Sequence, residues 1–280
     1  MQKAYKKYFP IFVLPTLLAF TLFFIIPFIM GIVLSFCKFT TVTNASFVGL
    51  NNYIRAFSNK DFLNALWFTV KFTVVSVITV NVFAFLLAYA LTRGIKGTNL
   101  FRTTFFMPNL IGGIVLGYIW QLLVNGVLAR FGVTIMSDAK YGFWGLVILM
   151  NWQLIGYMMI IYIAGIQNIS TDVLEAAKID GATKFQTLTK VTIPMVMSSV
   201  TICLFLTLTN SFKLFDQNLA LTAGGPAKKT SMLALDIYTT FYNRNGWEGV
   251  GQAKAVIFFV LVGILALSQL YFTRSKEVEN

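Results

Sequence analysis

The chain has 280 residues, of which 57% are hydrophobic and only 11% are charged, and its formal net charge is +12. Soluble globular domains are about 45–50% apolar and about 25% charged, so this composition excludes an ordinary soluble domain and indicates a lipid bilayer as the solvent. The positive charge would suggest nucleic-acid binding in a soluble protein. Here the basic residues flank apolar segments, so we interpret them as topology signals and expect no nucleic-acid partner.

Six apolar segments are long enough to cross a bilayer as helices, which takes about 20 residues each. They run from Ile11 to Phe36, Leu66 to Leu91, Phe105 to Leu128, Trp144 to Gln167, Ile193 to Phe215 and Ala255 to Phe272. The first segment is too long for a signal peptide and no cleavage site follows it, so we expect a retained helix. Pro27 lacks a backbone donor and predicts a kink or interruption in that helix.

The basic residues predict the orientation of these helices. An even number of spans puts both termini on one side, and short loops rich in Lys and Arg stay in the cytoplasm. The N-terminal tail and the short loop between the second and third segments are both basic and contain no acid. We therefore expect both termini in the cytoplasm. The residues that carry this argument are Lys3, Lys6, Lys7, Arg93, Lys96 and Arg102.

Three glycines stand out in the third segment: Gly112, Gly113 and Gly117. Gly113 and Gly117 are four residues apart and share one face of a helix, where small residues let another helix approach closely. This pattern favours tight helix packing over a role in solute binding.

The segment Ser170–Thr192 is too polar to span a membrane. Ser170 or Thr171 can cap a helix, and Asp172 followed by Glu175 has one form of a capping box. Gly181 then ends the helix in a left-handed conformation, and a second short helix follows over about residues 183–190. The pattern predicts a rigid helix–Gly–helix element that could transmit a push from a soluble partner. An ordinary surface loop remains the alternative.

No chemistry-bearing motif suggests that this chain is an enzyme. The phosphate-binding pattern G-x-x-x-x-G-K-[ST] does not occur, and in its nearest counterpart, Gly224 to Thr230, the spacing is wrong and a Pro interrupts. There is no His, and Cys203, one of two Cys, lies inside an apolar segment. We therefore predict no catalytic residues, no metal site, no disulfide and no cofactor bound by this chain.

Polar residues inside the fourth and fifth segments suggest a path for a solute, because polar groups within a membrane usually face a cavity. Aromatic faces and amides together suit a sugar, whose C–H surface stacks on rings while its hydroxyls take hydrogen bonds. The alternative is that Trp152 lies in an interfacial aromatic belt and that Asn210 bonds a neighbouring helix. Thr207, Asn210, Ser211 and Leu214 have the spacing of one helix face.

Three spaced motifs together resemble those of a known family. Glu175-Ala176-Ala177, then Gly181, then Ile193-Pro194 is similar to the EAA motif of permease subunits in binding-protein-dependent ABC importers. The string from Glu175 to Ala182, including Asp180, resembles the carbohydrate branch of that family. Leu221 to Pro226 and Phe101 to Pro108 resemble two further stretches of sugar permeases. The resemblance covers about Asn64 to the C-terminus.

The resemblance implies an all-α, polytopic membrane protein with six transmembrane helices and the type I ABC importer permease fold. It implies an N-terminal part of residues 1–63 with the first span, a five-helix core of residues 64–273 with a coupling loop of residues 170–192, and a cytoplasmic tail of residues 274–280. The implied function is uptake of a sugar or glycan across a bacterial cell membrane. The length resembles the large permease subunit of maltose and multiple-sugar importers.

The same resemblance assigns partners and site residues. The partners would be a second, homologous permease, two ATPase domains that bind ATP and Mg²⁺, an extracellular sugar-binding protein and membrane lipid. ATPase docking would fall to Glu175, Ala176, Ala177, Asp180, Gly181 and Pro194. Solute contacts would fall to Trp152, Gln153, Leu154, Tyr157, Thr207, Asn210, Ser211 and Leu214. Gln153, Asn210 and Leu214 depart from the maltose pattern, which puts maltose itself in doubt but not a saccharide.

A secondary, ion-coupled transporter is the alternative from another class. Such a transporter needs an ion-coupling site near the membrane midplane and usually has internal repeats. No acidic residue lies at the centre of any predicted span, and no repeat is visible. A structural or assembly protein of the membrane would not need the three spaced motifs.

Overall fold

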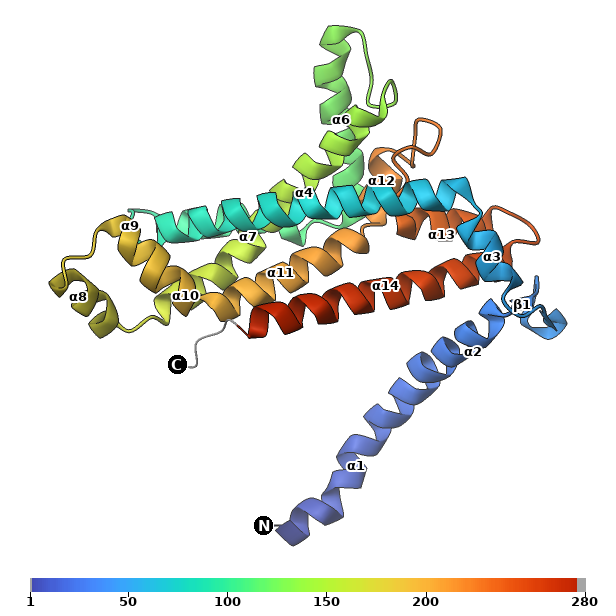
Figure 1. Ribbon diagram of the computed structural model, residues 1–280, viewed down its shortest axis with the longest axis horizontal. Helices are drawn as coiled ribbons and strands as arrows, with labels where there is room; N and C mark the ends of the chain where they lie inside the picture. The colour runs from blue at the N-terminus through green and yellow to red at the C-terminus, as the bar shows by residue number, and fades with distance from the viewer. Residues whose placement is uncertain (1, 276–280) are drawn as a thin grey trace. The chain divides into compact units, whose positions relative to one another are not determined.

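The computed structural model describes residues 2–275, with side chains from Phe9 onward, and it divides into two compact units (Figure 1). Unit 1 is the described part of residues 1–60 together with residues 237–259. Unit 2 is residues 61–236 together with the described part of residues 260–280. Of the expected cytoplasmic tail 274–280, residues 276–280 lie outside the described residues, and so do the side chains of the three N-terminal lysines.

Unit 1 begins with one long apolar helix. It comprises α1 (Gln2–Phe20), the π-helical turn η1 (Thr21–Ile25) and α2 (Ile26–Ser35). The π-helical turn ends two residues before Pro27, whose ring cannot donate a backbone hydrogen bond. The predicted interruption near Pro27 is therefore confirmed. Phe24 stacks on Phe28, and Phe28 meets Phe259 edge to face, with ring centroids 6.1 and 4.9 Å apart respectively.

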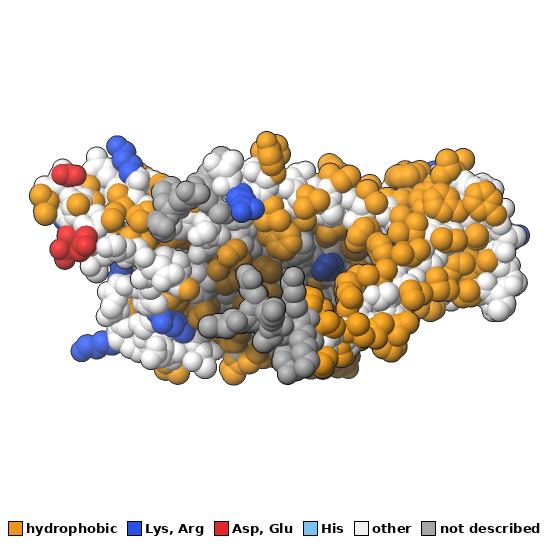
Figure 2. Space-filling model, turned by 90° about the horizontal axis from the view of Figure 1, so that it is seen from below, with side chains coloured by type: hydrophobic (Ala, Val, Ile, Leu, Met, Phe, Trp, Pro, Cys, Tyr) orange, Lys and Arg blue, Asp and Glu red, His pale blue; other side chains and the backbone are white. Residues whose placement is uncertain are grey.

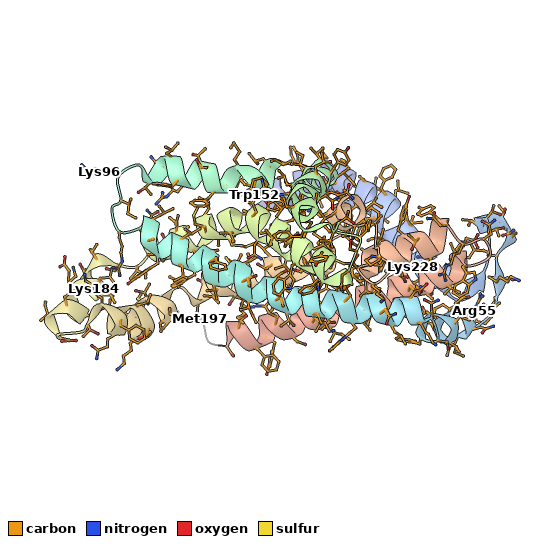
Figure 3. All side chains as sticks on the ribbon, turned by 90° about the horizontal axis from the view of Figure 1, so that it is seen from above. Arg55, Lys96, Trp152, Lys184, Met197 and Lys228 are labelled. Carbon is orange, nitrogen blue, oxygen red and sulfur yellow. The ribbon has the colours of Figure 1, made fainter. Side chains whose placement is uncertain are left out.

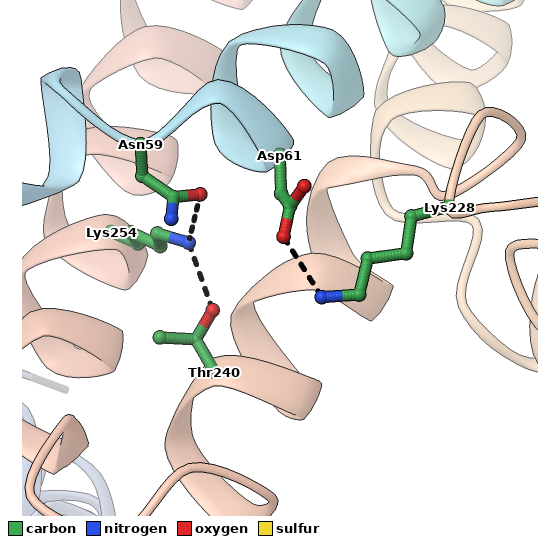
Figure 4. Close-up of polar contacts among 5 residues, drawn as sticks. All are labelled: Asn59, Asp61, Lys228, Thr240 and Lys254. Atoms are coloured by element: carbon green, nitrogen blue, oxygen red, sulfur yellow. Dashed lines mark hydrogen bonds and ion pairs between the residues drawn. The ribbon is translucent and has the colours of Figure 1, made fainter.

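The segment that follows this helix in unit 1 is small and is held by buried polar contacts. Strands β1 (Cys37–Lys38) and β2 (Ser46–Phe47) pair antiparallel around the short helix η2 (Val42–Asn44), and α3 (Asn51–Phe57) follows. Buried Asn52 donates to the carbonyls of Ser35 and Cys37 at 2.9 and 2.8 Å. Lys254 is fully buried and donates to Thr240 Oγ1 at 2.8 Å and to Asn59 Oδ1 at 3.5 Å (Figure 4).

Unit 2 holds most of the helices. In chain order they are α4 (Lys60–Leu91), α5 (Thr98–Phe106), η3 (Met107–Leu110), α6 (Gly113–Leu128), η4 (Ala129–Phe131), α7 (Ala139–Gln167), α8 (Thr171–Ile179), α9 (Lys184–Thr187), η5 (Leu188–Thr192), α10 (Ile193–Met195), α11 (Met197–Phe212) and α12 (Asp216–Leu221). Helix α4 begins at Lys60, the last residue of the N-terminal part of unit 1, and α13 (Leu233–Tyr242) and α14 (Glu248–Arg274) are also divided between the two units. Within unit 2, α4, α7 and α11 run side by side, and α6 rises away from them (Figure 1).

The core of unit 2 forms around α7. In its most apolar stretch 61% of α7 is buried, against 28% for α4, so α7 is the central helix. A buried chain of hydrogen bonds ties α4, α7 and α11 together. Tyr162 Oη donates to Asn81 Oδ1 at 2.8 Å, Asn81 Nδ2 donates to Thr207 Oγ1 at 3.2 Å, and Thr207 Oγ1 donates to the Cys203 carbonyl at 2.7 Å. Buried polar groups are tolerated because each finds such a partner.

The predicted spans agree with the structure in number but not in continuity. Among residues 2–275, five helices are long and apolar enough to cross a membrane, and a bent pair makes a sixth when it is counted as one span. The third predicted span is wrong as one helix, because the chain leaves helical geometry at Ile111 and Gly112, shortly after Pro108. The fifth is also broken, with a 68° bend between residues 184–195 and 197–212.

The segment after α11 is held by buried hydrogen bonds. Buried Asn218 donates to Thr222 Oγ1 at 3.0 Å and to the Thr230 carbonyl at 2.8 Å, and accepts from the Met232 amide at 2.9 Å. These bonds hold the loop of residues 222–232 closed. At its exposed edge, Lys228 Nζ lies 2.8 Å from Asp61 Oδ2 (Figure 4).

Candidate functional site

The coupling loop of residues 170–192 folds as predicted in outline. Ser170 is the N-cap of α8, and its Oγ accepts from the Asp172 amide at 3.2 Å. Gly181 has φ of +75°, which confirms the predicted left-handed residue. The Ala182 amide donates to the Ala177 carbonyl at 3.0 Å and the Gly181 amide to the Lys178 carbonyl at 3.1 Å. This pair of bonds is the helix-ending motif that favours glycine at its turn.

One detail of the loop differs from the prediction. The capping box expected at Asp172 and Glu175 does not form, because Ser170 already occupies the N-cap. A capping box forms instead at α9, where Thr183 accepts from the Gln186 amide at 3.2 Å and the Gln186 side chain accepts from the Thr183 amide at 2.8 Å. Both short helices therefore have fixed starting points.

The coupling loop leaves large apolar side chains mostly exposed. Ile179 is 85% exposed and Phe185 is 72% exposed. Glu175 and Asp180 are exposed too, and Figure 2 shows acidic side chains gathered at the end of the molecule where α8 lies. Apolar side chains rimmed by charge mark a surface that contacts another protein.

Both stems of the coupling loop belong to the central layer of unit 2. One stem is α7, which ends at Gln167, and the other is α10 with α11, where Pro194 is half-buried in the first turn of α10. The two stems touch each other next to the loop. A methyl group at Gly165 of α7 would lie only 3.0 Å from the Cβ of Ser199 in α11. The loop is therefore joined to two helices that pack against each other.

A second candidate site is a cavity of about 390 Å³ on the same two helices. Volumes of about 300–1,000 Å³ are typical of small-molecule sites. Helix α7 contributes four of the lining residues and α11 contributes two, while η3 and α12 contribute one each. The lining residues are Asn109, Met150, Gln153, Leu154, Tyr157, Leu206, Asn210 and Gln217.

Local packing sets the position of Asn109 in this cavity. The carbonyl of Phe105 lies directly against Gly156 of α7, so closely that a methyl group at Gly156 would overlap it. Buried Pro108 then turns the chain into η3 and places Asn109 at the cavity. The break in the third span, which was predicted as one helix, therefore contributes a residue to the lining of the cavity.

The structure brings only some of the predicted solute-path residues together. Gln153, Tyr157 and Asn210 line the cavity, as does Leu154. Trp152 is 44% exposed, lies on α7 beside α6 (Figure 3) and meets Trp120 edge to face at 5.7 Å. The remaining three, Thr207, Ser211 and Leu214, are buried away from the cavity.

Thr207, Asn210 and Ser211 share one side of α11, as their spacing predicted, but only Asn210 of these lies at the cavity. Thr207 faces Asn81 in the core, and Ser211 donates to the Thr207 carbonyl at 2.7 Å. Asn210, about 60° around the helix from Thr207, is exposed and lines the cavity, and Leu214 follows the end of α11. Conversely, Asn109 and Gln217 were not predicted. Only their polarity beside apolar helices could have indicated them.

Comparison with known proteins identifies the family of the chain. Residues 93–277 match the family described as "Binding-protein-dependent transport system inner membrane component". A probable starch degradation products transport system permease protein of Thermoanaerobacterium thermosulfurigenes is 43% identical, over 96% of this chain and 94% of that protein. A multiple sugar-binding transport system permease protein of Streptococcus mutans is 30% identical, over 99% of each chain.

A solved structure matches the whole fold. The chain superposes on a bacterial ABC transporter involved in the import of the acidic polysaccharide alginate with a TM-score of 0.82, over 98% of each chain and at 19% identity. A further structure of a bacterial alginate ABC transporter, in complex with an alginate-pentasaccharide-bound periplasmic protein, matches with a TM-score of 0.77, also at 19% identity. At this level of identity the likeness establishes the fold.

Proposed function

Because the chain belongs to the family of binding-protein-dependent transport system inner membrane components, we infer that it is a permease subunit of an ABC importer for sugars or oligosaccharides. It is a multi-pass inner-membrane protein of all-α, type I importer fold. It is not an enzyme, since the ATPase is a separate subunit in this class of importer. The family and fold favour this function over an ion-coupled secondary transporter.

The solute class follows from the relatives and from the cavity. The two relatives described above are named for starch degradation products and for multiple sugars. The cavity supports the same class, because carboxamides and a tyrosine hydroxyl line it beside apolar walls, and these groups suit hydroxyl-rich solutes. We propose that the solute path runs along Gln153, Tyr157 and Asn210, with Trp152, Thr207, Ser211 and Leu214 behind or beside it.

The proposed assembly contains a second permease, two ATPase domains and an extracellular sugar-binding protein. The coupling loop docks on an ATPase domain through Glu175, Ala176, Ala177, Asp180 and Gly181, with Pro194 in the stem. Exposed Ile179 and Phe185 fill apolar sites on that partner. ATP and Mg²⁺ are bound by the ATPase domains and not by this chain.

We also propose that both termini are cytoplasmic. The coupling loop then faces the ATPase domains in the cytoplasm, and the loop of residues 222–232 faces the binding protein outside. The basic loop between α4 and α5, with Arg93 and Lys96, lies on the same side as the coupling loop under this orientation.

The observation that carries the proposal is that one pair of helices, α7 and α11, bears both the coupling loop and the polar cavity. The test is uptake of a panel of labelled glycans by the reconstituted importer. Asn210→Ala should lower uptake of the transported glycan about 2- to 12-fold, the value of one neutral hydrogen bond. Gln167→Leu, at an exposed position of α7 outside the cavity, is the matched control. Unchanged uptake in Asn210→Ala would remove the cavity from the path.

A further inference from the structure

The cavity between α7, α11, η3 and α12 contains no formal charge. The eight residues that line it are four apolar or aromatic and four carboxamide side chains. Asn109 and Tyr157 make no side-chain hydrogen bond to any described residue, so their polar atoms are available to a solute. Importers of this fold also carry an acidic polysaccharide, so the fold alone does not determine the charge of the solute. The side chains that line the path can do so.

Two of the carboxamides are paired across the cavity. Gln217 Nε2 on α12 donates to Gln153 Oε1 on α7 at 2.8 Å. Gln153 is 8% exposed, so its amide is nearly removed from water. The pair uses one donor of Gln217 and one lone pair of Gln153, which leaves a further donor and acceptor capacity on each group.

The position of Gln217 is imposed by the packing of α12 on α6. A methyl group at Gly113 would lie 2.7 Å from the Asp216 Cβ and 3.0 Å from the Gln217 Cδ. Gln121 of α6 also donates to the Leu221 carbonyl at 3.0 Å, which fixes the end of α12. The backbone that carries Gln217 is therefore fixed by packing. A side chain that recognises the shape of a ligand needs such a fixed position. The glycines of the third segment thus serve packing, and that packing positions a side chain in the cavity.

We propose that the Gln153–Gln217 pair is the specificity element of this cavity and that it selects uncharged, hydroxyl-rich glycans over acidic ones. This inference rests on the proposed function of the cavity as part of the sugar path. Neighbouring hydroxyls on a sugar each donate and accept, and the paired amides present a donor and an acceptor side by side. A carboxylate that enters the cavity loses its water and meets no cation there, which is unfavourable.

The alternative is that the pair only fastens α12 to α7. Two variants of similar length and opposite charge separate these roles. Gln217→Glu keeps the pairing, because the Gln153 amide can turn and donate its Nε2 to the new carboxylate. Gln217→Lys keeps a donor toward Gln153 Oε1. A charge at position 217 acts on an acidic solute only if Gln217 faces the bound solute, and the two variants then move the binding of acidic glycans in opposite directions. If Gln217 lies away from the solute, they affect all solutes alike. Gln217→Leu completes the test, because it weakens maltotriose binding if the pair bonds the sugar.

The experiment measures direct binding to the complete importer in nanodiscs, without the binding protein, by saturation-transfer NMR. The probes are maltotriose and trigalacturonate, which have equal numbers of sugar units but differ in charge. The wild-type complex should bind maltotriose weakly and trigalacturonate at least about tenfold more weakly. Gln217→Lys should strengthen trigalacturonate binding about tenfold, and Gln217→Glu should weaken it further. Gln217→Leu should weaken maltotriose binding about 2- to 12-fold, and Gln167→Leu should change nothing.

The outcomes separate this inference from the proposed function. If Asn210→Ala weakens glycan uptake but Gln217→Lys and Gln217→Glu bind both trimers as the wild type does, the specificity role is overturned while the sugar path stands. Equal affinity of the wild type for the two trimers, or binding of neither, also overturns it. If uptake is unaffected by Asn210→Ala as well, the cavity is not on the path, and the proposed role of the cavity fails while the membership in the permease family stands.

Discussion

The turn at Gly181 offers the sharpest test of the coupling loop. Gly181 joins α8 to α9 with φ of +75°, and a Cβ built there would meet nothing within 4 Å. A substitution at this position therefore acts through the backbone conformation and not through a steric clash. Because the loop is exposed, the effect of such a substitution is confined to the relative orientation of the two short helices.

The size of the effect follows from the conformational preference of each residue type. A left-handed conformation costs an ordinary L-residue about 1–2 kcal/mol, and a β-branched residue is less suited to it still. About 1.4 kcal/mol corresponds to a factor of ten in an equilibrium. In Gly181→Val, the population of loops with the docking geometry should fall at least about fivefold. Asn tolerates positive φ, so Gly181→Asn should retain most of it.

The assay is stimulation of ATP hydrolysis by the loaded binding protein, measured together with uptake in proteoliposomes. Copurification of the ATPase reports assembly separately. The expected order of coupled activity is Gly, then Asn, then Ala, then Val. Wild-type stimulation and uptake in Gly181→Val would show that the turn geometry does not matter for coupling. Equal losses in Gly181→Asn and Gly181→Val would show that the effect does not come from φ.

Three further predictions concern orientation and packing. Both native cysteines are buried, so they should not react with an impermeant thiol reagent. A cysteine placed at Ser170 should then react only from the cytoplasm, and one placed at Ala227 only from outside. The reverse pattern would overturn the orientation. Gly156→Ala should destabilise the complex by about 1–3 kcal/mol, because its methyl group would overlap a carbonyl of α5. The measurement is a lower Tm. The control is Gly263→Ala, whose methyl group would meet open space. Asn218→Ala should speed proteolysis within residues 222–232, because buried partners lose their hydrogen bonds at about 1–3 kcal/mol each; a cleavage rate equal to that of the wild type would refute this role.

The parts of the fold that the sequence predicted are those set by local signals. Apolar length predicted the membrane helices, and Pro27 predicted an interruption that the π-helical turn η1 confirms. Gly181 predicted the left-handed turn of the coupling loop for the same reason, since one residue's backbone preference determines it. Pro108 and Gly112 gave a local signal too, but the long apolar run around them masked the break between η3 and α6.

The parts that were not predicted depend on contacts between residues far apart in the chain. Thr207 faces the core because Asn81, more than a hundred positions earlier, supplies its hydrogen-bond partner. Gln217 reaches the cavity because Gly113 lets α12 lie against α6. Helix periodicity alone cannot tell which polar position on this side of α11 enters the core and which reaches the cavity, since Thr207 and Asn210 are both polar. The choice is made by the neighbouring helices.

The same contacts suggest how a motion of the coupling loop reaches the cavity. Tyr157 lies ten residues before the end of α7, which is about 15 Å along a helix. α7 is continuous and closely packed over this length, so it moves as a rigid rod. The second stem is different, because the chain bends by 68° at Val196 between α10 and α11. A rotation of the loop can be taken up at that bend, while α7 transmits its displacement directly. The cavity walls on α7 and α11 would then shift relative to each other, and this relative movement is what opening or closing a site between two helices requires.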